Sequence, residues 1–131
     1  MKKFIILATL TGLLSSGCYQ TQEGRFRAGV PMSTDTIESK YERSVDEVFE
    51  AARKTLTYNG TLISENAIAK VLTARVDTHN IWVKVELAEP TITRIFTQAR
   101  ASSGRGDIHM SAEIDKQIAL NLRVMPTTIR Q

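Results

Sequence analysis

Three side chains of this sequence could take part in covalent or acid–base chemistry: the single cysteine, Cys18, and the two histidines, His79 and His109. A thiol can be a nucleophile or a metal ligand, and an imidazole can transfer protons near neutral pH. No third ligand at metal-site spacing accompanies either histidine, and the sequence contains no nucleophile elbow and no glycine-rich phosphate loop. We therefore predict that the protein is not an enzyme and has no catalytic residues, no metal site and no cofactor.

The histidines and the closest pairs of acidic residues have simple structural explanations. His79 lies in the polar segment Asp77–Asn80 between two predicted strands, where a solvated turn residue is expected. His109 lies in the first turn of the last predicted helix and is expected to be exposed or stacked at the helix start. One carboxylate pair fits a helix start and the other a solvated strand face: Asp46 with Glu47, and Glu86 with Glu89.

The cysteine follows a segment that has the three parts of an export signal. Lys2 and Lys3 come first, the apolar residues 4–14 follow, and the small residues 15–17 precede Cys18. The apolar part is too short for a membrane-spanning helix, which needs roughly 20 residues. Residues 1–17 are therefore predicted to be a signal peptide that is removed in front of Cys18.

The stretch LLSSGC, residues 13–18, resembles the lipobox of bacterial lipoproteins, although Ser15 stands where the usual pattern has leucine. The resemblance implies that the Cys18 thiol receives a diacylglyceryl group before cleavage and that the new amine is then acylated. Two or three acyl chains hold a protein firmly on a membrane, because each buried methylene contributes about 0.8 kcal/mol. The other interpretation is an ordinary secretory signal cut nearby, which leaves a free cysteine near the new N-terminus.

The residue after the cysteine bears on the location of the protein. In enterobacteria-like sorting an aspartate there favours the inner membrane, so Tyr19 indicates the periplasmic face of the outer membrane.

The full chain has 17 basic and 14 acidic residues, and removal of Lys2 and Lys3 leaves 15 basic residues. A nearly neutral mature chain gives little support for binding to nucleic acid. With Cys18 lipidated, no intramolecular disulfide can form.

About 114 residues remain after the signal peptide, which is enough for one small domain. Residues 18–35 are predicted to be the lipidated cysteine and a flexible tether, because they are polar, lack periodicity and carry two glycines and Pro31. Residues 36–123 are predicted to form the domain, and residues 124–131 a frayed tail.

Two segments have the apolar period of helices that are packed on one side. The first begins with the capping box Ser44–Glu47 and is expected to end at Asn59-Gly60 with the glycine in the left-handed conformation. The second is expected to begin at Asp107 as its N-cap. Their apolar residues are Val45, Val48, Phe49, Ala52 and Leu56 in the first helix, and Met110, Ile114, Ile118 and Leu122 in the second.

Between the two helices apolar residues alternate with polar ones, which predicts strands with one buried face. Val71–Val76 and Ile81–Leu87 follow this pattern, Ile37–Tyr41 is expected to be an edge strand, and Leu62–Ser64 a short strand. A one-sided sheet and two one-sided helices can cover each other. We therefore predict an α+β, two-layer sandwich, an antiparallel meander sheet with both helices on one face, in the order β-α-β-β-β-β-α.

The order of elements and several short motifs resemble a family of small bacterial lipoproteins catalogued only as a domain of unknown function. The likeness covers roughly residues 36–122: YERSVDEVFEAARKTL, VLTAR, TRIFTQAR, and a GD pair that opens the last helix. Arg100 replaces the glycine that often ends the third motif. The family has no assigned activity, so the resemblance implies no function. At the level of fold alone, the layout is also similar to the helix-grip domains of outer-membrane assembly lipoproteins.

Strand alternation also predicts which residues lie on the face of the sheet away from the helices. A four-residue loop at Asp77–Asn80 and a three-residue loop at Ala88–Pro90 keep the apolar residues on one side. The expected cross-strand pairs on the other side are Arg75 with Trp82, Thr73 with Lys84, Trp82 with Phe96, Lys84 with Arg94, and Glu86 with Ile92.

These pairs predict an interaction patch on the outer face of the sheet, made of Arg75, Trp82, Lys84, Arg94 and Phe96. Tryptophan, phenylalanine and arginine are enriched where proteins meet, so we expect the patch to bind another envelope protein or a second copy of the chain. The simpler interpretation is that the side chains merely cover the second face of a small sheet.

Three other hypotheses remain open from the sequence. A small ligand or lipid could bind in a cleft between the helices and the sheet, near Phe49, Val83 and Ile114. An unpaired edge strand could accept a strand from a partner. The cations of the outer face could bind an anion or a polysaccharide: Arg75, Lys84, Arg94 and Arg100.

Overall fold

The computed structural model describes residues 19–20, 26–27 and 35–127, and the chain divides into two compact units, residues 1–31 and 32–131. In the first unit Tyr19–Gln20 (β1) and Phe26–Arg27 (β2) form a short antiparallel pair. The lipidation site Cys18 and the predicted signal peptide lie outside the described residues. In the described part of the chain, no helix combines the length and apolar character needed to cross a bilayer.

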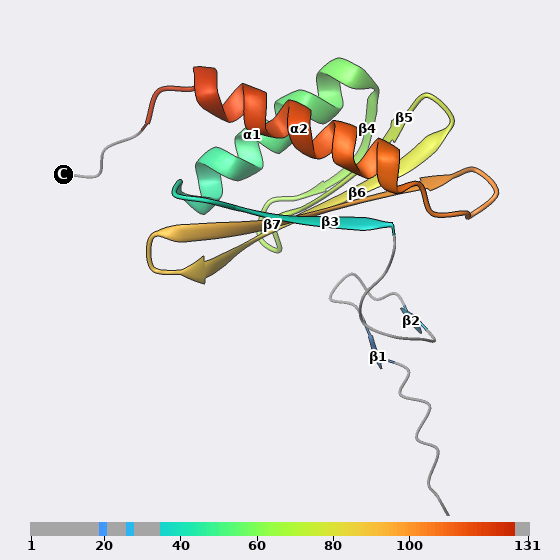
Figure 1. Cartoon of the computed structure of the whole chain (residues 1–131), viewed down its shortest axis with the longest axis horizontal. Coiled ribbons are helices and arrows are strands. Elements are labelled where there is room, and N and C mark those ends of the chain that lie inside the picture. Colours follow the sequence, from blue (N-terminus) through green and yellow to red (C-terminus); the bar gives the residue numbers. More distant parts are fainter. Residues whose placement is uncertain (1–18, 21–25, 28–34, 128–131) are drawn as a thin grey trace, which may run out of the picture. The chain divides into compact units, whose positions relative to one another are not determined.

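The second unit is an antiparallel five-stranded sheet with two helices, which confirms the predicted α+β fold class (Figure 1). The sheet order is β3-β7-β6-β5-β4, and both helices cover the same face. The elements in chain order are β3 (Thr36–Tyr41), α1 (Val45–Asn59), β4 (Thr61–Asn66), β5 (Val71–Val76), β6 (His79–Glu89), β7 (Ile92–Ala101) and α2 (Ile108–Val124).

Both helices begin at the residues that the sequence predicts. The Ser44 hydroxyl accepts a hydrogen bond from the Glu47 amide, and the Glu47 carboxylate accepts one from the Ser44 amide, so the capping box is complete. The Asp107 carboxylate accepts a hydrogen bond from the Met110 amide at the start of α2. Local polar contacts therefore define where each helix starts, independently of its packing.

The end of α1 differs from the prediction. Gly60 has φ −167°, which is extended and not left-handed, and its amide donates to the Leu56 carbonyl. A Cβ at Gly60 would lie 2.1 Å from the Arg75 carbonyl oxygen. The glycine is therefore needed for the close approach of the α1–β4 junction to β5, and not for its backbone conformation.

The core lies between the sheet and the helical layer. Residues at alternate positions of β5, β6 and β7 face the helices, and the inward faces of α1 and α2 pack on them. The following core side chains are fully buried: Val48, Ala52 and Leu56 of α1, Leu72 and Ala74 of β5, Ile81 and Val83 of β6, Ile95 of β7, and Ile118 of α2. On the edge strand β4, a bulge between Leu62 and Ser64 interrupts the ladder.

Replacement of Gly60 by alanine is expected to lower the free energy of unfolding by about 1–3 kcal/mol, because the backbone of β5 must move to admit the new methyl group. Urea titration followed by circular dichroism measures the change. The control is Thr61→Ala, which removes an exposed side chain at the next position. If Gly60→Ala unfolds at the same urea concentration as Thr61→Ala, the close approach of β5 does not constrain position 60.

Candidate functional site

The five residues of the predicted interaction patch all lie on the face of the sheet that the helices leave uncovered. Their neighbours along each strand, such as Ile81 and Ile95, are buried against the helices, so alternate residues point the other way. Arg75 is exposed, and Trp82, Lys84, Arg94 and Phe96 are partly buried. We call this surface the outer face.

The pairing of β5 with β6 differs from the prediction by two residues. The connecting turn consists of Asp77 and Thr78 alone, and Asp77 has a positive φ of 52°. His79 therefore pairs with Val76 as the first residue of β6 instead of lying in a four-residue loop. A shift of two residues preserves the face of every side chain, but Trp82 lies opposite Thr73 and not opposite Arg75.

The pairing of β6 with β7 also differs by two residues. A bulge between Leu87 and Glu89 leads into a tight turn, where a three-residue loop was expected. On the outer face Trp82 consequently pairs with Gln98, Lys84 with Phe96, and Glu86 with Arg94. The two aromatic residues are diagonal neighbours, and the predicted opposition of Lys84 and Arg94 does not occur.

Glu86 compensates the two cations nearest to it. Lys84 Nζ lies 3.0 Å from Glu86 Oε2, and Arg94 Nε donates to Glu86 Oε1 at 2.9 Å. Burial alone would raise the pKa of Glu86, but the hydrogen bonds from Lys84 and Arg94 outweigh it and hold the pKa below its ordinary value. The Arg94 guanidinium also lies 5.2 Å from the centre of the Phe96 ring. Glu38 Oε1 of β3 lies 3.8 Å from Arg94 Nη1, so two carboxylates accompany these two cations.

The other two cations of the outer face are in different situations. Arg100 Nε donates to the carboxylate of Asp35 at 2.8 Å. Arg75 lies opposite Asn80, and its guanidinium is 3.5 Å from the Asn80 amide oxygen. Three of these four cations pair with carboxylates, and Lys40 of β3, which lies opposite Arg94, adds an exposed fifth cation to the outer face.

The two histidines have different environments. His79 is not a solvated turn residue: its side chain is 17% exposed, and Nε2 lies 3.0 Å from Asp107 Oδ2. Its Nδ1 is buried and has no hydrogen-bond partner within the described residues. Hydrogen bonds to Asp107, first from the Met110 amide and then from His79, lower the pKa of that carboxyl. His79 thus connects β6 to the start of α2, whereas His109 is exposed as expected.

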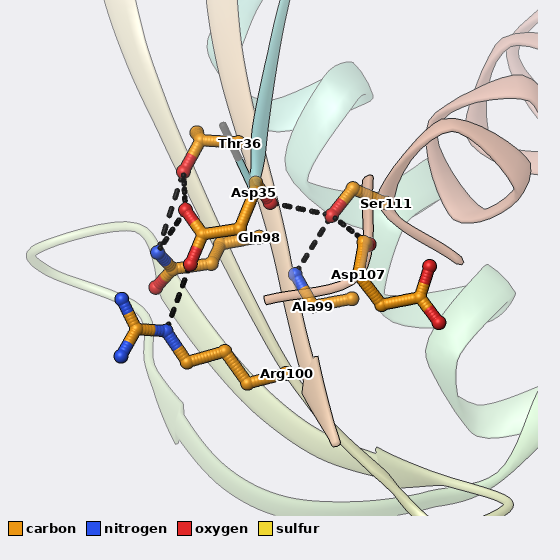
Figure 2. A network of polar contacts seen from close by, with 7 residues as sticks. All are labelled: Asp35, Thr36, Gln98, Ala99, Arg100, Asp107 and Ser111. Carbon is orange, nitrogen blue, oxygen red and sulfur yellow. Dashed lines mark hydrogen bonds and ion pairs between the residues drawn. The ribbon is translucent and has the colours of Figure 1, made fainter. Parts of the chain in front are cut away.

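A buried aspartate joins the sheet to the helical layer at the start of the domain (Figure 2). Asp35 directly precedes β3, and its carboxylate accepts hydrogen bonds from Gln98 and Thr36 in addition to the Arg100 contact. On the other side of the strand, its carbonyl accepts a hydrogen bond from the Ser111 hydroxyl of α2 at 2.6 Å. Asp35 therefore links the outer face of β7 to α2.

Two further contacts complete this network. The Ala99 amide donates to the Ser111 hydroxyl oxygen at 2.8 Å, so one buried hydroxyl connects β7 with α2. A Cβ at Gly106 would lie 2.5 Å from the Asp35 Cβ, which explains a residue without a side chain at that position. The sequence analysis did not identify this network, because its members are neighbours only in the folded chain.

A second, partly buried carboxylate joins the edge strand β3 to α2. Asp115 of α2 accepts a hydrogen bond from the Ser39 hydroxyl of β3 at 2.7 Å. Burial raises the pKa of Asp115, and the bond from Ser39 opposes this only in part. Tyr41 has a raised pKa through its own burial and through the nearby Asp115 charge. These contacts hold the edge strand β3 beneath α2.

Within the described residues, no group of three or more histidine, cysteine, aspartate or glutamate side chains could hold a metal ion. No known protein-family profile matches this sequence, and no curated protein matches it at a significant level. The resemblance to the lipoprotein family of unknown function therefore remains a prediction from its motifs.

Replacement of Asp35 by alanine is expected to lower the free energy of unfolding by about 1–3 kcal/mol, because Gln98 and Arg100 lose a buried acceptor. Thermal unfolding followed by circular dichroism measures the effect. The control is Glu50→Ala, which removes an exposed ion pair with Arg53 and should cost less than about 0.5 kcal/mol. Equal melting temperatures for the two variants would contradict the role of Asp35.

Asp115→Asn is expected to stabilise the protein at neutral pH. Because the pKa of Asp115 is raised in the folded state, that state binds more protons than the unfolded chain, and stability falls as pH rises through this range. Asparagine cannot ionise, so its advantage should disappear below the ordinary aspartate pKa of about 3.9. Urea titrations across pH test this, with Glu113→Gln as the control for loss of one exposed charge on α2. A pH-independent difference would show that ionisation of Asp115 is not the cause.

Proposed function

We propose that the chain is a bacterial lipoprotein, anchored through Cys18 at the periplasmic face of the outer membrane, and that its second unit is a non-enzymatic interaction domain. The anchor is supported by the LLSSGC stretch and the export signal before it. Tyr19, in place of an aspartate, supports the outer membrane over the inner membrane.

The observation that carries the interaction proposal is the outer face of the sheet. Both helices pack on the opposite face, so no element of residues 35–127 covers the strands on this side. Trp82 lies on the central strand β6, and Phe96 lies on the neighbouring strand β7. An aromatic pair on an otherwise polar surface is typical of the anchor residues of a protein interface.

The charges around the aromatic pair favour a protein partner over a simple anion. Glu86 forms ion pairs with both Lys84 and Arg94, and it holds both long side chains in place beside the ring of Phe96. Side chains that are ordered before binding lose less entropy on association. The proposed partner is another envelope protein, and self-association is the alternative occupant of the same face.

The second function considered from the sequence was binding of a small ligand or lipid in a cleft between the helices and the sheet. Phe49, Val83 and Ile114, which would line that cleft, all belong to the buried core cluster and are at most 6% exposed. The environment of these three residues is that of core side chains, and it does not favour binding of a ligand between the helices and the sheet.

Simultaneous replacement of Trp82 and Phe96 by alanine is expected to reduce capture of the partner by roughly tenfold or more, because both anchors of the outer face are lost. The measurement is a pulldown of the full-length chain from membranes solubilised in mild detergent, followed by direct binding of the purified partner. Intact-mass analysis of the same samples should find acyl chains on Cys18.

The matched control is Ile68→Ala with Leu87→Ala, which removes two exposed apolar side chains outside the outer face. A differently tagged second copy in the same cells distinguishes self-association from a different partner. Equal binding by the Trp82 and Phe96 variant and the wild type would overturn the interaction face. A mature N-terminus without acyl mass would contradict the lipid anchor at Cys18. The proposal for the outer face would then depend on the binding measurement alone.

A further inference from the structure

The helical side of the domain carries a groove between the C-terminal half of α1 and the facing part of α2. Its volume is about 660 Å³, which is within the range of about 300–1,000 Å³ common for small-molecule sites. The groove is separate from the outer face of the sheet, because its lining comes from the two helices. It is also separate from the core, since its residues are exposed or partly exposed.

An aromatic ring without a packing role stands at this groove. Tyr58 is 91% exposed, so its side chain contributes little to the stability of α1. A tyrosine ring offers a flat apolar surface and a hydroxyl that can donate or accept a hydrogen bond. The C–H faces of sugar rings stack on such surfaces.

Three amide side chains in the groove each use one of their two donor hydrogens within the protein. Asn121 Nδ2 donates to the buried Thr55 hydroxyl at 2.7 Å, and Asn59 Nδ2 donates to the Thr55 carbonyl at 2.8 Å. Gln117 Nε2 donates to Glu113 at 2.9 Å. One of the two hydrogens of each NH₂ group remains, so these amides can both donate to and accept from a ligand that carries hydroxyl groups.

The charges of the groove are nearly balanced. Arg53 binds the Glu50 carboxylate through two nitrogens, at 3.0 Å and 2.8 Å. Lys54 is exposed and makes no ion pair with another described residue, so it supplies a donor for a hydroxyl or carbonyl oxygen. A groove with one uncompensated charge does not favour a polyphosphate or a highly charged polymer.

From this combination we infer that the groove between α1 and α2 binds a saccharide, with a sugar ring stacked on Tyr58 and its hydroxyl groups donating to the amide oxygens of Gln117 and Asn121. Lys54 donates to a ring substituent of the same sugar. The inference adds a ligand site on the helical side of the domain and does not depend on the protein partner proposed for the outer face.

Titration with defined tetrasaccharides tests the inference. The full-length chain is kept in a detergent without a sugar head group, and binding of chitotetraose, cellotetraose and maltotetraose is measured by calorimetry. At least one of them is expected to bind the wild type. Tyr58→Ala should weaken that binding by roughly tenfold, and Tyr58→Phe, which keeps the ring, should weaken it much less. Gln117→Ala should also weaken it, through loss of one acceptor.

Two controls keep the result interpretable. Tyr58 and Gln117 lie at the surface, so circular dichroism should find their variants as folded as the wild type. Ile68→Ala removes another exposed side chain and should bind the saccharide normally, as should the Trp82 and Phe96 double variant. Failure of all three saccharides to bind at millimolar concentration, or equal binding by Tyr58→Ala, would overturn the inference. Loss of partner capture without loss of saccharide binding would separate the two sites.

Discussion

The arrangement of the second unit depends on the fact that its sheet buries one face and leaves the other to be covered by its own side chains. Val83 and Ile95 are fully buried under the helices, while Trp82 and Phe96, their neighbours along β6 and β7, are only partly covered. Both helices are needed on the same side, because each has one apolar stripe to bury. That neither helix covers the outer face is therefore a direct consequence of how the core is built.

The sequence predicts much of this fold because its strongest signals are local. The capping box at Ser44 and the N-cap at Asp107 act over three residues, and both are present as predicted. Side chains alternate between the two faces of a strand. A predicted pairing that is shifted by an even number of residues therefore still places each side chain on the correct face. Both hairpins differ from the prediction by two residues, so the faces were right and the opposing pairs were wrong.

The register was wrong because the turns are tighter than the polar composition of the loops indicates. Asp77 adopts a positive φ that allows a two-residue connection, and the bulge near Leu87 absorbs one residue in the next hairpin. The correct register also changes the electrostatics of the outer face. Glu86 lies opposite Arg94, so a pair of like charges that would disfavour the sheet becomes an attractive one.

The buried polar contacts had no signal in the sequence, because their partners are far apart along the chain. Arg100 and Asp35 are separated by 65 residues, and Ser39 and Asp115 by 76. His79 lies 28 residues before Asp107. Each of these residues is of a type that is common in turns and on solvated surfaces. The sheet order brings β3 beside β7 and under α2, which makes the first two pairs partners, and the packing of α2 on the sheet brings Asp107 to His79.

The position of Asp35 has a mechanical consequence. A force applied at Asp35 would act immediately before the edge strand β3. The carboxylate transmits such a force to β7, and the carbonyl transmits it to α2 through Ser111. A pull at this point is therefore shared between both layers and does not peel the edge strand away alone.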